Sequence, residues 1–192
     1  MRGDPDFRYF PDYKALAQFE PGPCSCHSTD QGPSFQCLTG QYFDNPDVPE
    51  AVCVEDLKAG VFRVYIDDYV IGLLEQSVRG IYPDWSSDQI QSHVERAIDE
   101  LSRTPPVPWI QHNAWPACHG DFCRYLGEWD QNKLNGMADR GDGKSYLMSI
   151  IQEPEGVGDP DGLWENIGNG WAAIFVFECL SCGRHIAIDQ SY

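Results

Sequence analysis

The sequence predicts an α+β fold in one compact domain that carries small cysteine sites of the zinc-knuckle type. An amphipathic helix followed by apolar strand-like segments, a turn-rich N-terminal region and eight cysteines support this prediction. A chain of 192 residues corresponds to about one domain and buries roughly 70% of the surface that it exposes when unfolded. We therefore expect residues 1–192 to form a single domain, with a cysteine-containing N-terminal lobe at 1–60 and the main α+β core at 61–192.

The N-terminal region, up to about Asp56, is predicted to be rich in loops because Gly-Pro, Asn-Pro and Val-Pro pairs interrupt it. Loops of this kind rarely become ordered without a covalent or metal staple. Between Val52 and Val78 many of the apolar residues are β-branched or aromatic, so helix and strand compete. Only a short helix that begins near Glu55 is predicted in that stretch.

The segment from Ser86 to Ser102 is the clearest helix. Ser86 and Gln89 have the spacing of a capping box, and apolar residues follow on one face of a 3.6-residue period. These apolar residues are Ile90, Val94, Ala97, Ile98 and Leu101. The helix must end before Pro105, because a residue that precedes proline avoids helical backbone angles.

The last third of the chain is predicted to contain strands joined by loops. Residues 144–152 and 171–179 are apolar runs that indicate strands, the second of them buried, and residues 186–188 form a short final strand. Residues 141–145 resemble the end of a phosphate-binding loop but lack its upstream glycine, so a turn is predicted. Residues 153–161, rich in glycine, proline and acids, are predicted to be a loop.

The second half of the chain holds the stronger candidate metal site. Residues 179–183 read Cys-Leu-Ser-Cys-Gly, a spacing that lets two thiolates converge on one cation while the glycine permits a tight turn. Residues 118–123 offer a second half-site, and together they predict a closed structural zinc tetrahedron. The predicted ligands are Cys118 or His119, Cys123, Cys179 and Cys182. Buried reduced cysteines that act as small hydrophobes and a redox dithiol are the alternatives.

A second, weaker metal site is predicted in the N-terminal lobe. Its cysteines are irregularly spaced, since the first pair is C-x-C rather than C-x-x-C, and a carboxylate is a less common ligand in structural zinc sites. The candidate ligands are Cys24, Cys26, His27, Cys37, Cys53 and Asp56.

The net charge restricts the partners of this chain. There are 13 Lys and Arg against 30 Asp and Glu, which gives a net charge of −17. Such a chain repels nucleic-acid phosphates and anionic membranes, and it attracts cations or basic proteins. The sequence has no apolar stretch of about 18 residues and no secretory signal pattern, so we expect a cytoplasmic protein without a membrane span.

The sequence carries no recognisable catalytic signature. H-E-x-x-H, G-x-S-x-G and G-x-G-x-x-G are absent, and the Cys/His pairs at 118–119 and 182–185 have no identifiable third group to orient them. We therefore predict that the protein is not an enzyme. One alternative is a zinc-dependent hydrolase or thiol enzyme that uses Cys118, His119 and Asp121, and another is a zinc-stabilised adaptor in a stress response.

Three motifs together resemble those of a known family. Residues 7–12 read Phe-Arg-Tyr-Phe-Pro-Asp, residues 118–127 read Cys-His-Gly-Asp-Phe-Cys-Arg-Tyr-Leu-Gly, and residues 174–185 end in Cys-Leu-Ser-Cys-Gly-Arg-His. In these motifs and in their order, the chain resembles the CbrC-type colicin-tolerance family of bacterial proteins. It departs from the family pattern at residues 118–119, where Cys and His are exchanged.

The resemblance implies tolerance or immunity towards a bacterial protein toxin. This direction agrees with the charge, since one-signed fields accelerate association with oppositely charged partners. We therefore predict an immunity or tolerance protein that binds and neutralises a basic bacterial toxin domain. Acidic groups would steer the partner, and aromatic residues within 118–129 or 61–74 would anchor it.

Overall fold

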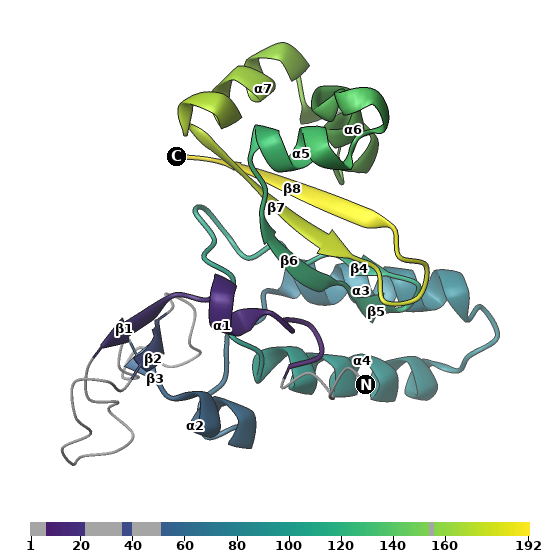
Figure 1. Cartoon of the computed structure of the whole chain (residues 1–192). Coiled ribbons are helices and arrows are strands. Elements are labelled where there is room, and N and C mark those ends of the chain that lie inside the picture. The colour runs from purple at the N-terminus through teal and green to yellow at the C-terminus, as the bar shows by residue number, and fades with distance from the viewer. Residues whose placement is uncertain (1–6, 22–35, 40–50, 154–155) are drawn as a thin grey trace, which may run out of the picture.

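A three-stranded antiparallel sheet, in the order β6–β7–β8, lies at the centre of the computed structural model (Figure 1). The structure describes residues 7–21, 36–39, 51–153 and 156–192. The strands are β6 (Arg124–Glu128), β7 (Ala172–Glu178) and β8 (His185–Ser191). The β7–β8 register pairs Phe175 with Ile188 and continues from Ala172 to Glu178 without a bulge.

Strand β7 is buried on both of its faces. Phe175 and Phe177 belong to one hydrophobic cluster, whereas Ile174 and Val176 belong to another on the opposite side of the sheet. This position explains why the segment is continuously apolar instead of alternating, and it confirms the predicted buried strand. The final strand is also confirmed, although β8 is longer than the predicted 186–188.

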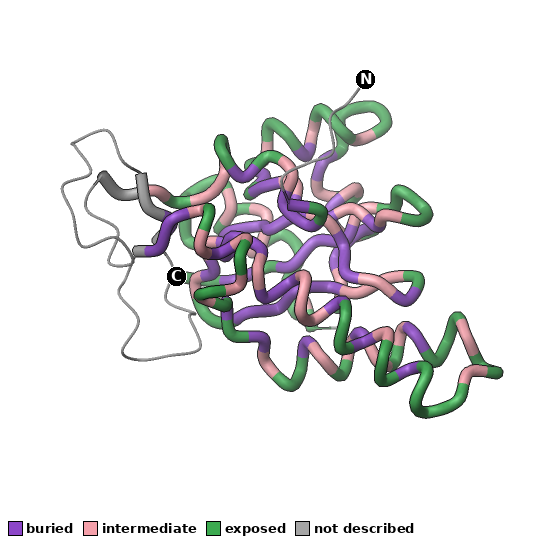
Figure 2. Tube along the Cα trace, turned by 90° about the horizontal axis from the view of Figure 1, so that it is seen from below, coloured by how far each residue is buried: buried purple, intermediate pink, exposed green. Residues whose placement is uncertain are grey.

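Helices cover both faces of the sheet (Figure 1). On one side lie α3 (Asp68–Ile81) and α4 (Ser87–Ser102), and on the other lie α5 (Gln131–Met137), α6 (Gly143–Ile150) and α7 (Pro160–Asn169). Figure 2 shows buried residues gathered in the interior of this arrangement, with exposed residues along the outer helical turns. The α+β prediction is therefore confirmed. Within the described residues, no helix is both long enough and apolar enough to cross a membrane.

The remaining elements are short. They are α1 (Tyr13–Leu16), β1 (Phe19–Pro21), β2 (Gln36–Thr39), β3 (Ala51–Val52), α2 (Val54–Ala59), β4 (Ala117–Cys118), β5 (Asp121–Phe122) and a 3-10 helix (Asp139–Gly141). The segment before α1 packs on the main core, because Phe10 stacks edge-on against Tyr125 and the Tyr125 amide donates to the Tyr9 carbonyl at 2.7 Å.

Helix α4 is capped as the sequence predicts. The Gln89 amide donates to Ser86 Oγ at 3.3 Å, and the Ser86 amide donates to Gln89 Oε1 at 2.8 Å. Its predicted apolar face points into the main cluster, with Val94 and Leu101 buried. The helix ends at Ser102, as expected before the two prolines.

The strand predicted at 144–152 is wrong, because this segment forms helix α6. Asp142 caps the helix by accepting from the Ser145 amide at 3.0 Å, and Leu147 and Ile150 are buried on one side. A short apolar run does not distinguish a strand from a buried helix face, and the capping acid decides here. The turn predicted at 141–145 is correct for residues 141–142 only, because helix α6 begins at Gly143.

The structure also resolves one ambiguous region and corrects one predicted loop. The ambiguous stretch from Val52 to Val78 becomes α2 and most of α3, and the short predicted helix near Glu55 is confirmed as α2. Helix α7 begins inside the loop predicted at 153–161, since Asp159 caps it and Pro160 occupies its first position. Helices α5 and α7 were not predicted.

The α4 cap gives a direct test of the fold. Ser86→Ala removes the acceptor for the Gln89 amide, so the free energy of unfolding should fall by about 1 kcal/mol in urea denaturation. Ser87→Ala, at the exposed first position of the same helix, is the matched control and should change stability by less than about 0.5 kcal/mol. Equal effects of the two substitutions would contradict the capping role.

Candidate metal centre

Two turns bring four ligand-type side chains together: Cys118, His119, Cys179 and Cys182. One ligand atom from each lies within 4.8 Å of the others. His119 Nδ1 is 3.1 Å from Cys118 Sγ and 3.6 Å from Cys179 Sγ. Sulfur and nitrogen ligands of a tetrahedral zinc ion lie about 3.5 Å apart, given the usual metal–ligand bond lengths. These four side chains can therefore hold a metal ion.

The first half of the cluster comes from the β4–β5 hairpin. Cys118 pairs with Asp121, so only His119 and Gly120 form the turn. Both have positive φ, 55° and 76°, which is the backbone conformation of a type I′ turn. Such a tight turn lets the neighbouring side chains of Cys118 and His119 reach one point, which adjacent residues on an extended strand seldom do.

Helices α3 and α4 hold this turn in place. The Gly120 amide donates to Ser77 Oγ at 2.9 Å, and His93 Nε2 donates to the Gly120 carbonyl at 2.7 Å. A Cβ at Gly120 would lie 3.2 Å from the Tyr82 ring, so both the backbone angle and the packing favour glycine. Protein contacts thus position the turn without requiring a metal.

The second half of the cluster is the connection between β7 and β8. The Gly183 amide donates to the Cys179 carbonyl, and the Cys179 amide donates to the Arg184 carbonyl, both at 2.9 Å. Gly183 has a φ of 70°, as the C-x-x-C-G pattern predicts for the residue that closes the turn. Cys179 is buried and Cys182 is exposed, so the site lies at the surface.

The surroundings shift the pKa values of the Cys179 and Cys118 thiols in opposite directions. Burial disfavours the Cys179 thiolate, but backbone hydrogen bonds from Cys182 and Ser181 outweigh it and lower the pKa of Cys179 to about 7. Burial, followed by the neighbouring Cys179 sulfur, raises the pKa of Cys118 to about 12. Near neutral pH the Cys179 thiol is therefore partly ionised while the Cys118 thiol stays protonated, and a bound cation would favour the thiolate form of both.

Cys123 lies outside the group of four, although it was among the predicted ligands. It is fully buried, burial raises the pKa of its thiol, and its carbonyl accepts from Trp115 Nε1 at 2.7 Å. The structure instead places both Cys118 and His119 in the group of four, whereas the prediction used one of the two as a ligand. The His-Gly pair between two short strands is the sequence signal that indicates this tight turn.

Asp121, the acid of the alternative enzyme prediction, is engaged in structural contacts. Its carboxylate accepts from the Tyr9 hydroxyl at 2.7 Å and from its neighbour's amide, that of Phe122, at 2.9 Å. It also forms an ion pair with Arg8. Tyr9 and Arg8 thereby join the N-terminal segment to β5. Because these groups engage the Asp121 carboxylate, it does not orient a nucleophile.

The other Cys/His pair of the sequence does not form a catalytic arrangement. His185 Nδ1 forms a hydrogen bond with the Tyr146 hydroxyl at 2.5 Å, and its ring packs edge-on against Trp129. Burial lowers the pKa of His185, which keeps the imidazole neutral in this packed position. No hydrogen bond within the described chain joins it to Cys182.

The second predicted metal set falls largely outside the described residues. Cys24, Cys26 and His27 lie there, and Cys37 is described only by its backbone in β2. Cys53 is buried and is the N-cap of α2, where its sulfur accepts from the Asp56 amide at 3.4 Å. The N-terminal metal site therefore stays a prediction.

The fold and the cluster together define a small α+β protein with a surface Cys/His centre. Over residues 5–190 the chain matches the family described as "Uncharacterised protein family (UPF0167)", and it belongs to that family. It is 26% identical over 190 residues to UPF0167 proteins of Mycobacterium bovis and Mycobacterium tuberculosis, covering 95% of this chain and 91% of each relative. No solved structure matches the chain.

The ligand assignment can be tested by elemental analysis of purified variants. Cys182→Ala removes one of the four ligands at an exposed position, so bound metal should fall well below the level of the unchanged protein. Cys123→Ala is the matched control, since Cys123 is outside the group, and it should retain the metal. Loss of metal in the Cys123 variant together with retention in the Cys182 variant would overturn this assignment.

Proposed function

We propose that this chain is a non-catalytic protein, held together by a structural zinc ion, that binds and neutralises a basic bacterial toxin domain. The observation that carries the first part is the donor set. Three sulfurs and one imidazole nitrogen supply four ligands, which is a full tetrahedral shell. A zinc ion held by all four leaves no position for the water or substrate that a catalytic site needs.

Zinc is the metal that this donor set favours, because Cys₃His is a common structural zinc site. The ion would join the β4–β5 hairpin to the β7–β8 connection, segments 61 residues apart at Cys118 and Cys179. It would therefore tie the helical layer of α3 and α4 to the end of the central sheet.

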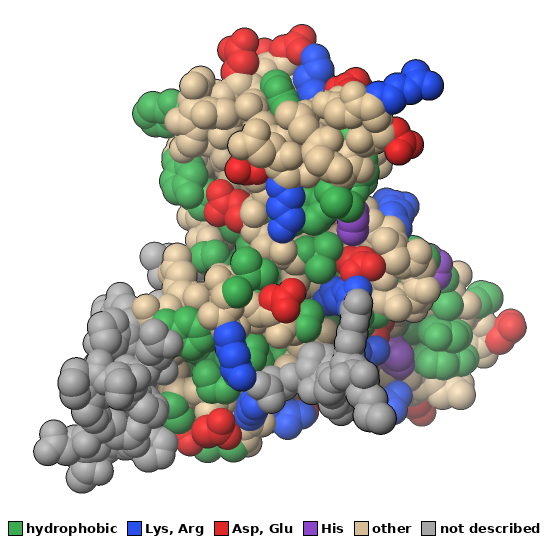
Figure 3. All heavy atoms as spheres, in the orientation of Figure 1, with side chains coloured by type: hydrophobic (Ala, Val, Ile, Leu, Met, Phe, Trp, Pro, Cys, Tyr) green, Lys and Arg blue, Asp and Glu red, His purple; other side chains and the backbone are tan. Residues whose placement is uncertain are grey.

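The partner prediction depends on charge and on the family resemblance. With a net charge of −17, the protein attracts basic surfaces and speeds their association. On the face drawn in Figure 3 the acidic side chains are scattered, with Lys and Arg among them. Long-range attraction therefore steers a partner without defining the docking position. The resemblance to the colicin-tolerance family supports a toxin as that partner.

The structure corrects one of the two predicted anchoring segments. Within residues 118–129 the aromatic side chains, including Tyr125 and Trp129, are buried in the core and cannot contact a partner. Within residues 61–74, Tyr65 and Tyr69 are each 46% exposed. Aromatic anchoring is therefore available in the second segment, at and before the start of α3.

The enzyme alternative finds less support. The thiol with the lowered pKa, Cys179, is only 2% exposed, which hinders attack on a substrate. Asp121 is already held by Tyr9 and Arg8. A thiol enzyme needs an accessible thiolate beside an oriented base.

Removal of the metal should destabilise the fold. Zinc at about a thousandfold excess over its Kd adds about 4 kcal/mol, and 1 kcal/mol shifts the Tm of a chain of this size by roughly 2–4 °C. We therefore expect a strong chelator, under reducing conditions, to lower the Tm by about 10 °C, with recovery when zinc is restored. The Cys182→Ala variant is the control, and its Tm should not respond to the chelator. An unchanged Tm after verified metal loss would contradict a structural role.

The toxin proposal is tested by affinity purification and inhibition. The tagged chain, purified from its native host at low salt, should retrieve a basic protein with a toxin domain, and binding should weaken at about 1 M salt through screening. The purified toxin domain should lose its activity when the chain is added in equimolar amount. Retrieval of no basic partner, or binding without inhibition, would contradict this function.

A further inference from the structure

A cavity beside the outer edge of β8 lies apart from the metal centre. Its volume is about 380 Å³, within the usual range for ligand pockets. Its walls include Tyr69, His112, Gln152, Glu153, Ile188 and Asp189. Among the described residues that line it, two are acids and none is Lys or Arg. The cavity is therefore rich in hydrogen-bond acceptors and carries negative charge.

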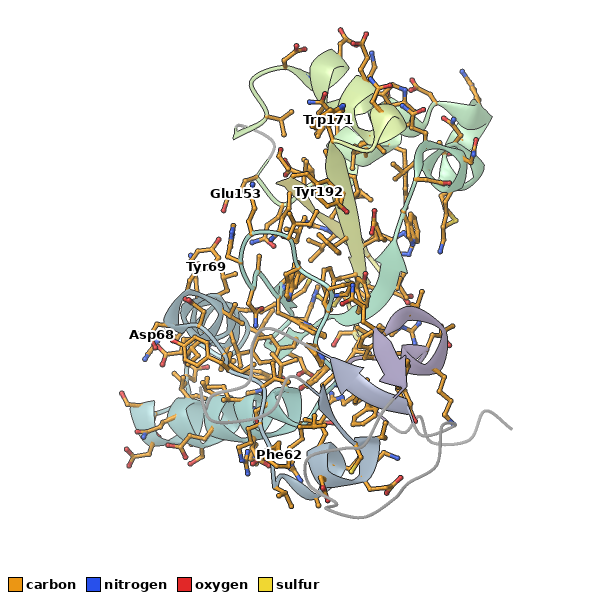
Figure 4. All side chains as sticks on the ribbon, turned by 90° about the vertical axis from the view of Figure 1, so that its left-hand side faces the viewer. Phe62, Asp68, Tyr69, Glu153, Trp171 and Tyr192 are labelled. Carbon is orange, nitrogen blue, oxygen red and sulfur yellow. The ribbon has the colours of Figure 1, made fainter. Side chains whose placement is uncertain are left out.

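An aromatic ring and a carboxylate are held together at this cavity. The Tyr69 hydroxyl donates to Glu153 Oε1 at 3.0 Å, which joins the first turn of α3 to the segment after α6. Figure 4 shows Tyr69 and Glu153 close to each other on the same side of the molecule, with Asp68 near them. Since a carboxylate has about four lone-pair sites, Glu153 can still accept from a ligand.

The edge of β8 contributes a free backbone position to the same cavity. The Ala187 carbonyl accepts from the Gln152 amide, and the Ser191 carbonyl accepts from Gln111 Nε2, both at 2.9 Å. These bonds show that odd-numbered residues of β8 direct their backbone groups away from β7. Asp189 lies between them, and the described residues supply no hydrogen-bond partner for its outward backbone groups.

The wall of the cavity also holds an unpaired acceptor. Gln152 Oε1 is buried and has no hydrogen-bond partner within the described chain. Buried polar atoms are rarely left unpaired, so this exception calls for an explanation. The oxygen is sealed from solvent in this side-chain conformation, so a ligand would reach it only after the Gln152 side chain turned into the cavity.

We propose that this cavity receives an arginine side chain of the basic partner. A guanidinium offers five N–H donors and a permanent positive charge, and its flat face stacks on tyrosine rings. It would pair with Glu153 and Asp189 and lie against Tyr69. The inference deepens the proposed function and rests on it, because the arginine would belong to the basic partner proposed there.

The charges of a second cavity favour this position over the alternative. A larger cavity of about 930 Å³ lies against α4, but its lining includes Arg8, Lys58, Arg96 and Arg103. Three acids, Glu95, Asp99 and Glu100, also line it, and two of them form ion pairs with Arg8 and Arg103, so this cavity carries no net negative charge to attract a basic segment. Of the two cavities, the one at β8 is therefore the better match for a positively charged partner.

A blocked Gly-Arg-Gly peptide is the first probe, titrated into the full chain and followed by NMR. We expect saturable shifts at Tyr69, Gln152, Glu153 and Asp189. The same peptide with citrulline, which is uncharged but of nearly the same shape, should cause no shifts there. Equal binding of the citrulline peptide, or shifts confined to another surface, would overturn the proposal. Free arginine that bound at least about tenfold tighter than the peptide would indicate a small-molecule site and overturn the docking role.

Charge-removing variants test which residues bind. Glu153→Gln and Asp189→Asn should each weaken peptide binding about threefold to fivefold, as expected for exposed ion pairs, and about tenfold together. Glu165→Gln removes an equal charge from the exposed side of α7 and is the matched control. Thermal unfolding of each variant confirms that it is folded. Unchanged binding by the folded double variant would overturn the assignment.

The same variants separate this inference from the proposed function. If the double variant loses the retrieved toxin while the Glu165 variant keeps it, the inference is supported. If both variants retain and inhibit the toxin equally, the docking position is overturned while the proposed function stands. If the peptide binds as expected but no basic toxin is retrieved or inhibited, the proposed function fails, and the docking role fails with it.

Discussion

The burial of β7 on both of its faces is the constraint on which the rest of the structure depends. Its side chains alternate between two hydrophobic clusters, so helices must cover the sheet on each side. One cluster receives the N-terminal segment, α3 and α4, and the other receives α5, α6 and α7. Because β7 is anchored in this way, the position of the turn that follows it is fixed at the end of the sheet. Cys179 and Cys182 lie in this turn, so their positions are fixed as well.

The candidate centre is formed where this turn meets the β4–β5 hairpin. The hairpin is positioned by Ser77 and His93, and the β7–β8 turn is positioned by the sheet. A metal ion would thus join two preformed parts rather than organise a loop. This arrangement suits a stabilising centre, and the partner binding that we propose would use other surfaces, such as the acidic cavity beside β8.

Local patterns predicted the parts of the chain whose surroundings impose a simple period or a defined turn. The α4 helix follows from its capping box and its apolar face, and the buried strand β7 follows from its unbroken apolar run. The C-x-x-C-G sequence predicted one half of the metal cluster. Local pattern fails for the helix at 143–150 because its apolar residues are few and adjacent, and helix and strand differ there mainly through the cap at Asp142.

The sequence by itself determined the α+β class, the acidic character and the presence of a thiol pair suited to metal binding, since these depend on composition and on residues near each other in the chain. Only the tertiary structure decided which residues complete the cluster. The choice of Cys118 and His119 over Cys123 depends on a turn with positive φ at two residues and on helices that hold it. Likewise, the cavity beside β8 joins residues from α3, the segment after α6 and the last strand. Such contacts between distant segments arise from packing, which no local pattern encodes.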